Sequence, residues 1–321
     1  MGGRGLKKIK HVIEGEVIGL VDYIWNNSKD DPLIEAVKMS GLFQPPETDK
    51  ETWKKTTKHA LAHTWSQKPL HGQYVRQADE ISTKQSTYKW LKEAGLKAET
   101  EALITAAQDQ ALNTKSHKTK IMKISNDAKC RLCNSMDETT EHILSGCQVL
   151  AGTEYTKRHN EVAKHIHRNL CENYGIKTPE RPWMHQPEAV IETEEVKILW
   201  DFEIRTDRVI PARRPDIVVL NKSNRTATII DIAVPSDRNI KTKEREKIEK
   251  YQDLRLEIQR LWNVKAEVIP IVIGALGNIT SELEGYLNKL PGNHRLAPLL
   301  KAALLGSAHI LRKTFDLPEF W

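Results

Sequence analysis

Two groups of residues in this sequence have the types and spacing that chemistry requires. Three cysteines and a histidine fall within 18 residues, in the pattern C-x-x-C-x(8)-H-x(4)-C: Cys130, Cys133, His142 and Cys147. A two-residue gap lets two thiolates hold one ion from a tight turn, and four ligands without a vacancy are typical of a structural Zn²⁺ site. The alternative is a chance cluster of cysteines. Cys171 lies outside the pattern and is interpreted as a buried or bystander thiol.

The second group begins with two aspartates in apolar segments that are typical of strands. Asp216 opens one segment and Asp231 interrupts the next. If a tight turn is centred between Ser223 and Asn224, residues whose numbers sum to 447 face each other, which pairs Asp216 with Asp231. Opposed residues have Cβ atoms about 4.5–5.5 Å apart, so we expect the two carboxylates to hold one hard cation such as Mg²⁺. A slip of one residue would separate them onto opposite faces.

A lysine in the following segment is the third candidate. Residues 241–262 have helical spacing, with Lys247 at the centre of the apolar stripe and Lys250 at its edge. A lysine directed toward two acids is placed to stabilise phosphoryl charge and to orient an attacking water. The alternative is a lysine whose stem follows the apolar surface to solvent.

One further acid and two arginines complete the candidate site. Asp201, Glu203 and Asp207 precede the two strands, and Glu203 is chosen as the third Mg²⁺ ligand because it alternates with Asp201. Arg213 and Arg214 are expected to clamp a phosphate. The alternative is that they are ordinary exposed arginines at the start of a strand.

The periodicity of the sequence changes near residue 196. Before that point the spacing predicts helices over residues 6–42, 52–114 and 155–174. After it, four short β-branched segments are typical of strands, at residues 198–204, 217–220, 226–234 and 268–273. Helices are expected again at 281–290 and 296–313. The prediction is an α+β protein whose C-terminal part is a mixed α/β domain.

Composition and charge limit the class of protein. With 321 residues, 39% hydrophobic and 29% charged, the chain is typical of a folded protein of about two domains. We divide it into a helical linker region (1–50), a basic helical region (51–126), a zinc segment with its following helix (127–175) and an α/β domain (190–321). No apolar run approaches the ~20 residues of a membrane span, and no secretory signal is evident, so we expect an intracellular protein.

The basic region carries a concentrated positive charge. Between Thr52 and Asn126 there are 13 Lys and Arg against 6 Asp and Glu, an excess larger than the net charge of +6 for the whole chain. This block also contains Trp53, Trp65, Tyr74, Tyr88 and Trp90. Such a combination suits a phosphate backbone with rings for stacking. The alternative is a solvated helical surface with aromatic residues in the core.

These motifs together resemble the C-terminal region of early-branching, site-specific non-LTR retrotransposon polyproteins, which end in a zinc knuckle and a restriction-like endonuclease. The motifs that carry the resemblance are Pro215-Asp216, Asp231, Lys247-x-x-Lys250-Tyr251, the four zinc ligands and Arg158-His159-Asn160. It spans roughly Lys54 to the end of the chain. It implies a PD-(D/E)xK domain with Asp216 and Asp231 as metal ligands, Lys247 or Lys250 as the catalytic lysine, and Tyr251 as an accessory residue. Arg158 and His159 are taken as nucleic-acid contacts.

The resemblance also implies a function and a setting. In that family the endonuclease nicks genomic DNA and exposes a 3′-hydroxyl from which the reverse transcriptase primes cDNA synthesis. The implied partners are double-stranded target DNA, the RNA of the element and its reverse-transcriptase module, and the implied location is the nucleus. The alternative is a catalytically inactive remnant that binds DNA or RNA, and a third hypothesis is a zinc-stabilised scaffold protein.

Two features depart from familiar patterns. Restriction enzymes place a lysine two residues after the second acid, but position 233 is Ala; in the retrotransposon family the lysine is taken to lie on the helix, as Lys247 does. No reverse-transcriptase palm motif is found, because the adjacent acids Asp30 and Asp31 lie in a loop context. We therefore expect a fragment or a separately encoded tail that cannot copy RNA.

Overall fold

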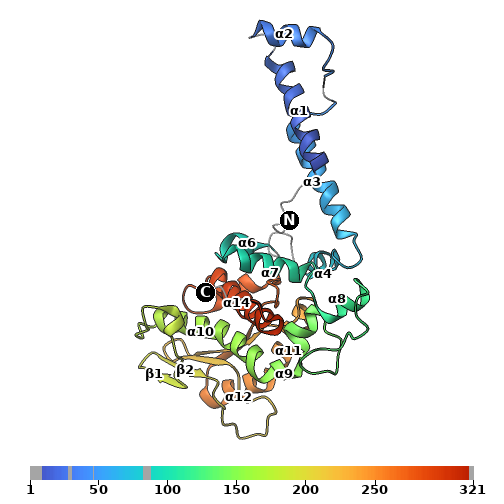
Figure 1. The fold of residues 1–321 in the computed structure, drawn as a ribbon. Coiled ribbons are helices and arrows are strands. Elements are labelled where there is room, and N and C mark those ends of the chain that lie inside the picture. Colours follow the sequence, from blue (N-terminus) through green and yellow to red (C-terminus); the bar gives the residue numbers. More distant parts are fainter. Residues whose placement is uncertain (1–8, 28–30, 46, 82–87, 318–321) are drawn as a thin grey trace. The chain divides into compact units, whose positions relative to one another are not determined.

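The chain forms two compact units, which are described separately. The computed structural model describes residues 9–27, 31–45, 47–81 and 88–317 (Figure 1). One unit extends to Gln73 and the other begins at Tyr74. Residues 74–126 and the zinc segment therefore belong to the same unit as the sheet, whereas the sequence predicts separate regions for them. None of the helices in the described ranges combines the length and apolarity needed to cross a membrane.

The N-terminal unit is helical, as predicted. Its helices are α1 (Ile9–Asn27), α2 (Pro32–Met39) and α3 (Lys50–Ser66). The side chain of Asp31 accepts a hydrogen bond from Leu33 N at the start of α2, where a proline occupies the first turn. Asp49 caps α3 in the same way. Helix α1 contacts α3, and the carboxylate of Asp22 accepts a hydrogen bond of 2.8 Å from the backbone N–H of Lys50.

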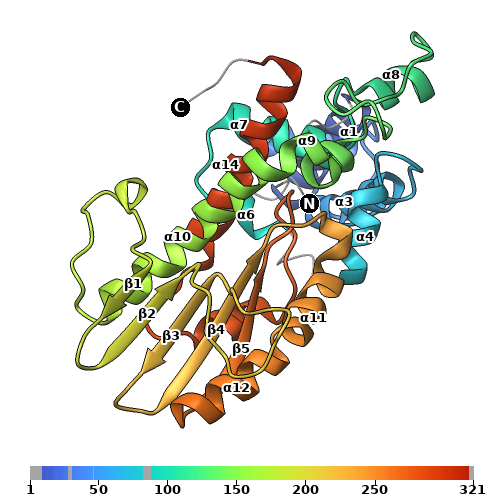
Figure 2. The ribbon, with the colours of Figure 1, turned by 90° about the horizontal axis from the view of Figure 1, so that it is seen from below.

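The C-terminal unit contains a five-stranded sheet with the order β1-β2-β3-β4-β5 (Figure 2). Its strands are β1 (Val190–Glu192), β2 (Val196–Trp200), β3 (Ile217–Asn221), β4 (Thr226–Ala233) and β5 (Lys265–Val272). The first four are antiparallel neighbours, and β5 is parallel to β4. A parallel pair requires a crossover connection, which α11 (Ile240–Lys250) and α12 (Gln252–Trp262) provide. The α+β class is thus confirmed.

Each face of the sheet has its own core. One face packs against α10 (Thr156–Asn173) and α14 (Leu296–Phe315), and includes Ile230 and Ile232. The other face packs against α12 and includes Ile229. Figure 2 shows these helices on opposite sides of the sheet. Since side chains alternate along a strand, β4 is apolar on both faces, as its nearly continuous hydrophobic sequence predicts.

Shorter helices complete the C-terminal unit. The α-helices are α4 (Gln73–Ile81), α6 (Lys89–Glu93), α7 (Ala98–Gln108), α8 (Lys115–Lys120), α9 (Gln148–Leu150) and α13 (Leu283–Lys289). Two π-helical turns, η1 (His142–Gly146) and η2 (Ala151–Tyr155), and two 3₁₀ turns, η3 (Pro182–Met184) and η4 (Asp237–Asn239), lie between them. Trp90 and Tyr74 are buried in the main core. These two aromatic residues therefore have the core role that was the alternative to stacking on nucleic acid.

Candidate functional site

The four predicted metal ligands lie together. The ligand atoms of Cys130, Cys133, His142 and Cys147 all lie within 4.8 Å of one another. The Sγ atom of Cys133 is 3.3 Å from Nε2 of His142. The two cysteines of the turn are held by a short β-bridge, in which Cys130 N donates to Met136 O at 2.8 Å. The spacing therefore predicted a real cluster that is able to hold a metal ion, and its donors are consistent with zinc.

A π-helical turn sets the distance between the histidine and the last cysteine. Residues 139–143 predict the start of a helix with His142 on its first turn, and the structure has the wider π-turn η1 from His142, with Cys147 directly after it. Tyr155 stabilises this turn, because its Oη atom donates to Ile143 O at 2.7 Å and accepts from Cys147 N at 3.0 Å. The hydroxyl of Tyr155 thus fixes the backbone on which two ligands lie, a role that no pattern in the sequence indicates.

The surroundings of Cys133 and Cys147 shift the pKa values of their thiols in opposite directions. Hydrogen bonds from the hydroxyl and backbone of Ser135 lower the pKa of Cys133 to about 5, so that this thiol is a thiolate at neutral pH. Burial raises the pKa of Cys147 to about 11. Metal binding would therefore release a proton from Cys147.

The cluster is part of the main core and not a separate module. Cys130 and Cys147 are buried in the core that the sheet and α14 share. Arg131 donates to both oxygens of the fully buried Glu138 and to Thr314 O at the end of α14. Glu138 thus holds the guanidinium of Arg131 in place, and the hydrogen bond from Arg131 to Thr314 O joins the turn to the C-terminal helix.

The strand register is the one that the sequence predicted. Ile217 pairs with Ile230 and Asn221 with Thr226, so the residue numbers of each pair sum to 447. Strand β3 begins at Ile217, one residue after Asp216. Asp216 therefore precedes the strand at the position that faces Asp231, which lies within β4.

Asp216 joins the end of the sheet to α10. Its Oδ2 atom accepts a hydrogen bond of 2.6 Å from Ile232 N, because β3 has not yet begun at that point of the ladder. The same oxygen lies 3.1 Å from Nε2 of His159, which is also 3.2 Å from Ile232 O. The other ring nitrogen, Nδ1, faces the side-chain oxygen of Asn160 at 3.0 Å.

The surroundings of His159 favour its charged form. Both ring nitrogens face oxygen acceptors, so both are expected to carry protons. Burial opposes this charge, but the hydrogen bond and the negative charge of Asp216 outweigh it and raise the pKa of His159 to about 9. In turn, although burial acts in the opposite direction, His159 lowers the pKa of Asp216.

Asp231 lies deeper and is paired with the predicted lysine. Its side chain is 2% exposed and forms an ion pair with Lys247, while Lys250 is 3.9 Å from its Oδ1 atom. Burial, together with the charge of Asp216, raises the pKa of Asp231 against the opposing effect of Lys247. Apart from the ion pair with Lys247, the Oδ2 atom of Asp231 has no hydrogen-bond partner among the described residues.

Tyr251 makes hydrogen bonds to two groups beside Asp231. It is fully buried, accepts a hydrogen bond of 2.8 Å from Lys250 Nζ and donates one of 3.2 Å to Arg214 O. Burial and the nearby Asp231 raise its pKa, so the hydroxyl keeps its proton. Tyr251 thereby links the end of α11 to the loop that precedes Asp216.

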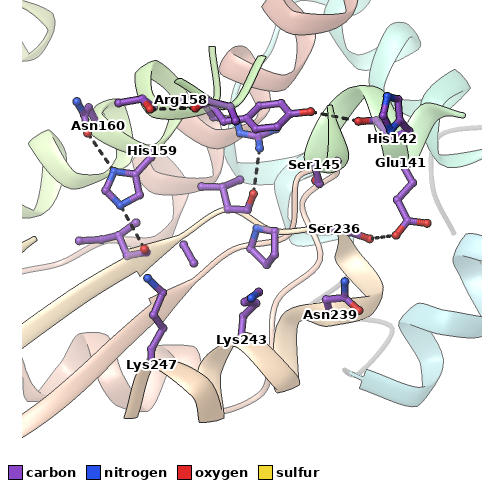
Figure 3. A pocket seen from close by; sticks show the side chains of 18 of the residues that line it. Glu141, His142, Ser145, Arg158, His159, Asn160, Ser236, Asn239, Lys243 and Lys247 are labelled. Carbon is purple, nitrogen blue, oxygen red and sulfur yellow. Dashed lines mark hydrogen bonds between the residues drawn. The ribbon is translucent and has the colours of Figure 1, made fainter. Parts of the chain in front are cut away.

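A groove of about 960 Å³ opens beside these residues, although Asp231 is not among those that line it. Asp216, His159, Lys247 and Lys243 are among its lining residues. Figure 3 shows His159 and Lys247 directed into the groove from opposite sides, one from α10 and the other from α11. An acid, an imidazole and an ammonium group therefore face one space that is open to solvent.

Glu203, chosen as the third acid, lies beyond the end of β2 and outside the lining of the groove. Strand β2 ends at Trp200, and Asp201 has a left-handed backbone with φ +46°, so the chain leaves the sheet before position 203. The carboxylate of Glu203 pairs with Arg213 at 2.9 Å, whereas Asp201 lines the groove. The period-two pattern on which Glu203 was chosen thus does not continue past Trp200.

The three arginines differ sharply in accessibility. Arg213 pairs with Glu203, and Arg214 makes two hydrogen bonds of 2.7 Å to the carboxylate of Asp201; their side chains are 38% and 62% exposed. Both remain accessible to a phosphate. Arg158, in contrast, is 2% exposed.

The interior position of Arg158 argues against its assignment as a nucleic-acid contact. Its guanidinium donates to Leu144 O, Val234 O and Ser307 Oγ at 2.9–3.0 Å. Gly306 leaves space for its stem, because a Cβ atom there would come within 2.5 Å of Arg158 Cγ. Arg158 instead binds together η1, α14 and the residue that follows β4, and only the next residue, His159, reaches the groove.

Comparisons with known proteins give no identification. No known family matches the sequence, and no curated protein matches it either.

Proposed function

We propose that the C-terminal unit is a metal-dependent DNA endonuclease of the PD-(D/E)xK kind. The observation that carries the proposal is the convergence of Asp216, Asp231 and Lys247 at one end of β3 and β4, in the register that sums to 447. These groups also interact electrostatically. Beside the effect of burial, the charge of Asp216 raises the pKa of Asp231, and the charge of Lys247 lowers the pKa of Asp216. Carboxylates and a lysine around one space are the groups that phosphodiester hydrolysis needs.

The residues fit a hard divalent cation such as Mg²⁺. The Oδ2 atom of Asp231 is buried and held only by an ammonium group, and Asp216 Oδ2 and Ile232 O both lie within 3.2 Å of one imidazole nitrogen. Lys247 and His159 thus occupy positions where positive charge is favoured. The two carboxylates and the Ile232 carbonyl would hold Mg²⁺, with Glu203 no longer included. The chemistry that such an ion supplies is polarisation of the phosphate and a lowered pKa of bound water.

The side chains divide the remaining tasks. Lys247 would stabilise negative charge on the phosphate as water attacks phosphorus and the bond to O3′ breaks, giving a 3′-hydroxyl and a 5′-phosphate. His159 holds Asp216 in place, and Tyr251 positions Lys250 and the loop that carries Arg214. Arg213 and Arg214 would contact the DNA backbone. The metal cluster at residues 130–147 would hold structural Zn²⁺.

The wider setting follows the same proposal. A nick with a 3′-hydroxyl would prime cDNA synthesis by a reverse-transcriptase module of the same retrotransposon, on the RNA of that element. The site of action would then be the nucleus, on double-stranded target DNA.

One observation favours a second function, binding of DNA or RNA without cutting. His159 and Lys247 already neutralise both aspartates through direct contacts. Nicking of supercoiled plasmid in Mg²⁺ distinguishes the two functions. Endonuclease activity predicts nicks that are lost in Asp216→Ala and in Asp231→Ala and retained in Asp207→Ala, whose exposed carboxylate pairs with Arg260. Nicking that persists in both of the first two variants would overturn the site; a wild type that binds DNA without nicking it would establish the second function.

A further inference from the structure

A second cluster of metal-binding side chains lies on the same helix as His159. His167 and Cys171 are four residues apart on α10 and therefore share one face of the helix. His185 follows the 3₁₀ turn η3 and meets them from the segment that leads to β1. All three are buried, at 0%, 1% and 5% exposed.

The ligand atoms of these residues converge on one point. Nδ1 of His167 is 2.8 Å from Nε2 of His185 and 3.6 Å from Sγ of Cys171, and all three atoms lie within 4.8 Å of one another. Bonds of about 2.0–2.1 Å to nitrogen and 2.3 Å to sulfur at tetrahedral angles give a separation of about 3.5 Å between a nitrogen and a sulfur ligand. The observed separation of 3.6 Å agrees with that value. The two nitrogens would need to move apart by roughly 0.5 Å to reach the corresponding spacing.

The cluster at residues 130–147 provides an internal comparison. Its Cys133 and His142 ligand atoms are 3.3 Å apart, also slightly closer than in a tetrahedral site. Within the described residues, these two groups are those in which three or more histidine, cysteine or acidic ligand atoms gather within 4.8 Å. The geometry that identifies the predicted zinc ligands thus also identifies His167, Cys171 and His185.

We propose that His167, Cys171 and His185 form a second zinc site, with two imidazoles and one thiolate as protein ligands. Three protein ligands leave a fourth position for water or a carboxylate. Glu188 and Glu172 lie close enough for their charges to act on Cys171. The metal would fasten the proline-containing segment 176–187 to α10, and so hold the start of the sheet against the helix that carries His159. This site does not depend on the proposed nuclease activity.

Zinc content of the purified full-length chain tests the proposal. Elemental analysis should find two zinc ions per chain in the wild type, one in Cys171→Ser and one in Cys147→Ser. The matched control is His165→Gln, a half-buried histidine on the same helix, which should retain two. One zinc ion in the wild type, with no change in Cys171→Ser, would overturn the proposal.

Cobalt titration gives a test that needs no variant. With Co²⁺ in place of zinc, each thiolate ligand adds charge-transfer absorption in the near ultraviolet. A first equivalent bound by three thiolates and a second bound by one should give intensities in a ratio of about three to one. Saturation after a single equivalent, or a second equivalent without thiolate absorption, would contradict the second site.

Discussion

His159 Nε2 lies 3.1 Å from Asp216 Oδ2, so that α10 and the start of β3 meet through a charged pair. Their side chains are 26% and 22% exposed, which leaves the pair accessible from the groove. This contact connects the metal cluster and the sheet, because α10 follows directly from the turns that hold Cys147. It also makes the charge of His159 dependent on Asp216, with a consequence for stability that can be measured.

The stability of the chain should fall as pH rises from about 6.5 to 9. The pKa of His159 is raised to about 9 in the folded protein, above its ordinary value of 6.5, so the folded state keeps a proton that the unfolded state loses in this range. The stabilisation is therefore complete below pH 6.5 and is lost through pH 9, a change of up to about 3 kcal/mol. Denaturant unfolding of zinc-loaded protein without Mg²⁺ measures it. His159→Gln should show a weaker pH dependence and His165→Gln the wild-type one; equal slopes in all three would refute the charged pair.

Lys247 should matter more for nicking than Lys250. Lys247 contacts Asp231 directly, whereas Lys250 is 3.9 Å away and 46% exposed. Lys247→Ala is expected to slow nicking by about 100-fold to 1,000-fold, comparable to the loss of one group that stabilises the transition state. The test is the single-turnover rate at which each variant nicks supercoiled plasmid, with the affinity for DNA measured separately. A larger loss in Lys250→Ala would assign the catalytic role to the other lysine.

Arg158 and Arg214 should respond to truncation in opposite ways. Arg158→Ala removes three hydrogen bonds of a buried guanidinium and leaves their acceptors unsatisfied, which should cost about 3 kcal/mol or more in unfolding free energy. Arg214→Ala should change stability by less than about 1 kcal/mol, since its ion pair is exposed. It should instead weaken DNA binding and reduce the salt dependence by about one phosphate contact. Unchanged salt dependence would remove Arg214 from the proposed DNA surface.

Tyr155→Phe should weaken the metal cluster without removing a ligand. The lost hydroxyl leaves Ile143 O and Cys147 N without their partner. Changes of this kind around a metal site lower affinity by about 10-fold to 100-fold. Competition with a chromogenic chelator measures the affinity, and Tyr23→Phe on the exposed surface of α1 is the control. Equal affinity in both variants would show that Tyr155 does not support the ligands.

The sequence was sufficient for the features that depend on local patterns. The strands around Asp216 and Asp231, their register and the four clustered ligands all follow from local composition and spacing, because two short β-branched apolar runs joined by a tight turn leave little freedom. Strand β1 was missed, since three mostly exposed residues carry no such pattern. The helix predicted over 241–262 is divided at Tyr251, where the backbone has φ −106° and ψ 14°. No apolar period encodes that break.

Features that depend on tertiary packing could not be predicted from local patterns in the sequence. Glu203 was chosen by alternation, and the left-handed conformation of Asp201 could not be read from its residue type. Arg158 and His159 are adjacent, yet one is interior and the other lines the groove, because α10 rotates them to different sides. Cys171 was interpreted as a bystander because it lies outside the spacing of the four predicted ligands; His185, whose ligand atom lies near it in the fold, is 14 residues further along the chain. The burial of Arg158 and the gathering of His185 with Cys171 depend on how α10 packs.

Binding of Mn²⁺ to the zinc-loaded chain tests the central claim most directly, that Asp216 and Asp231 share one divalent cation. Electron paramagnetic resonance of free Mn²⁺ counts bound ions without requiring any cleavage. The wild type should bind one Mn²⁺ per chain, and Asp216→Asn and Asp231→Asn should each abolish that binding, while Asp207→Asn should retain it. Binding that is unchanged in either of the first two variants would show that the two aspartates do not share a metal ion.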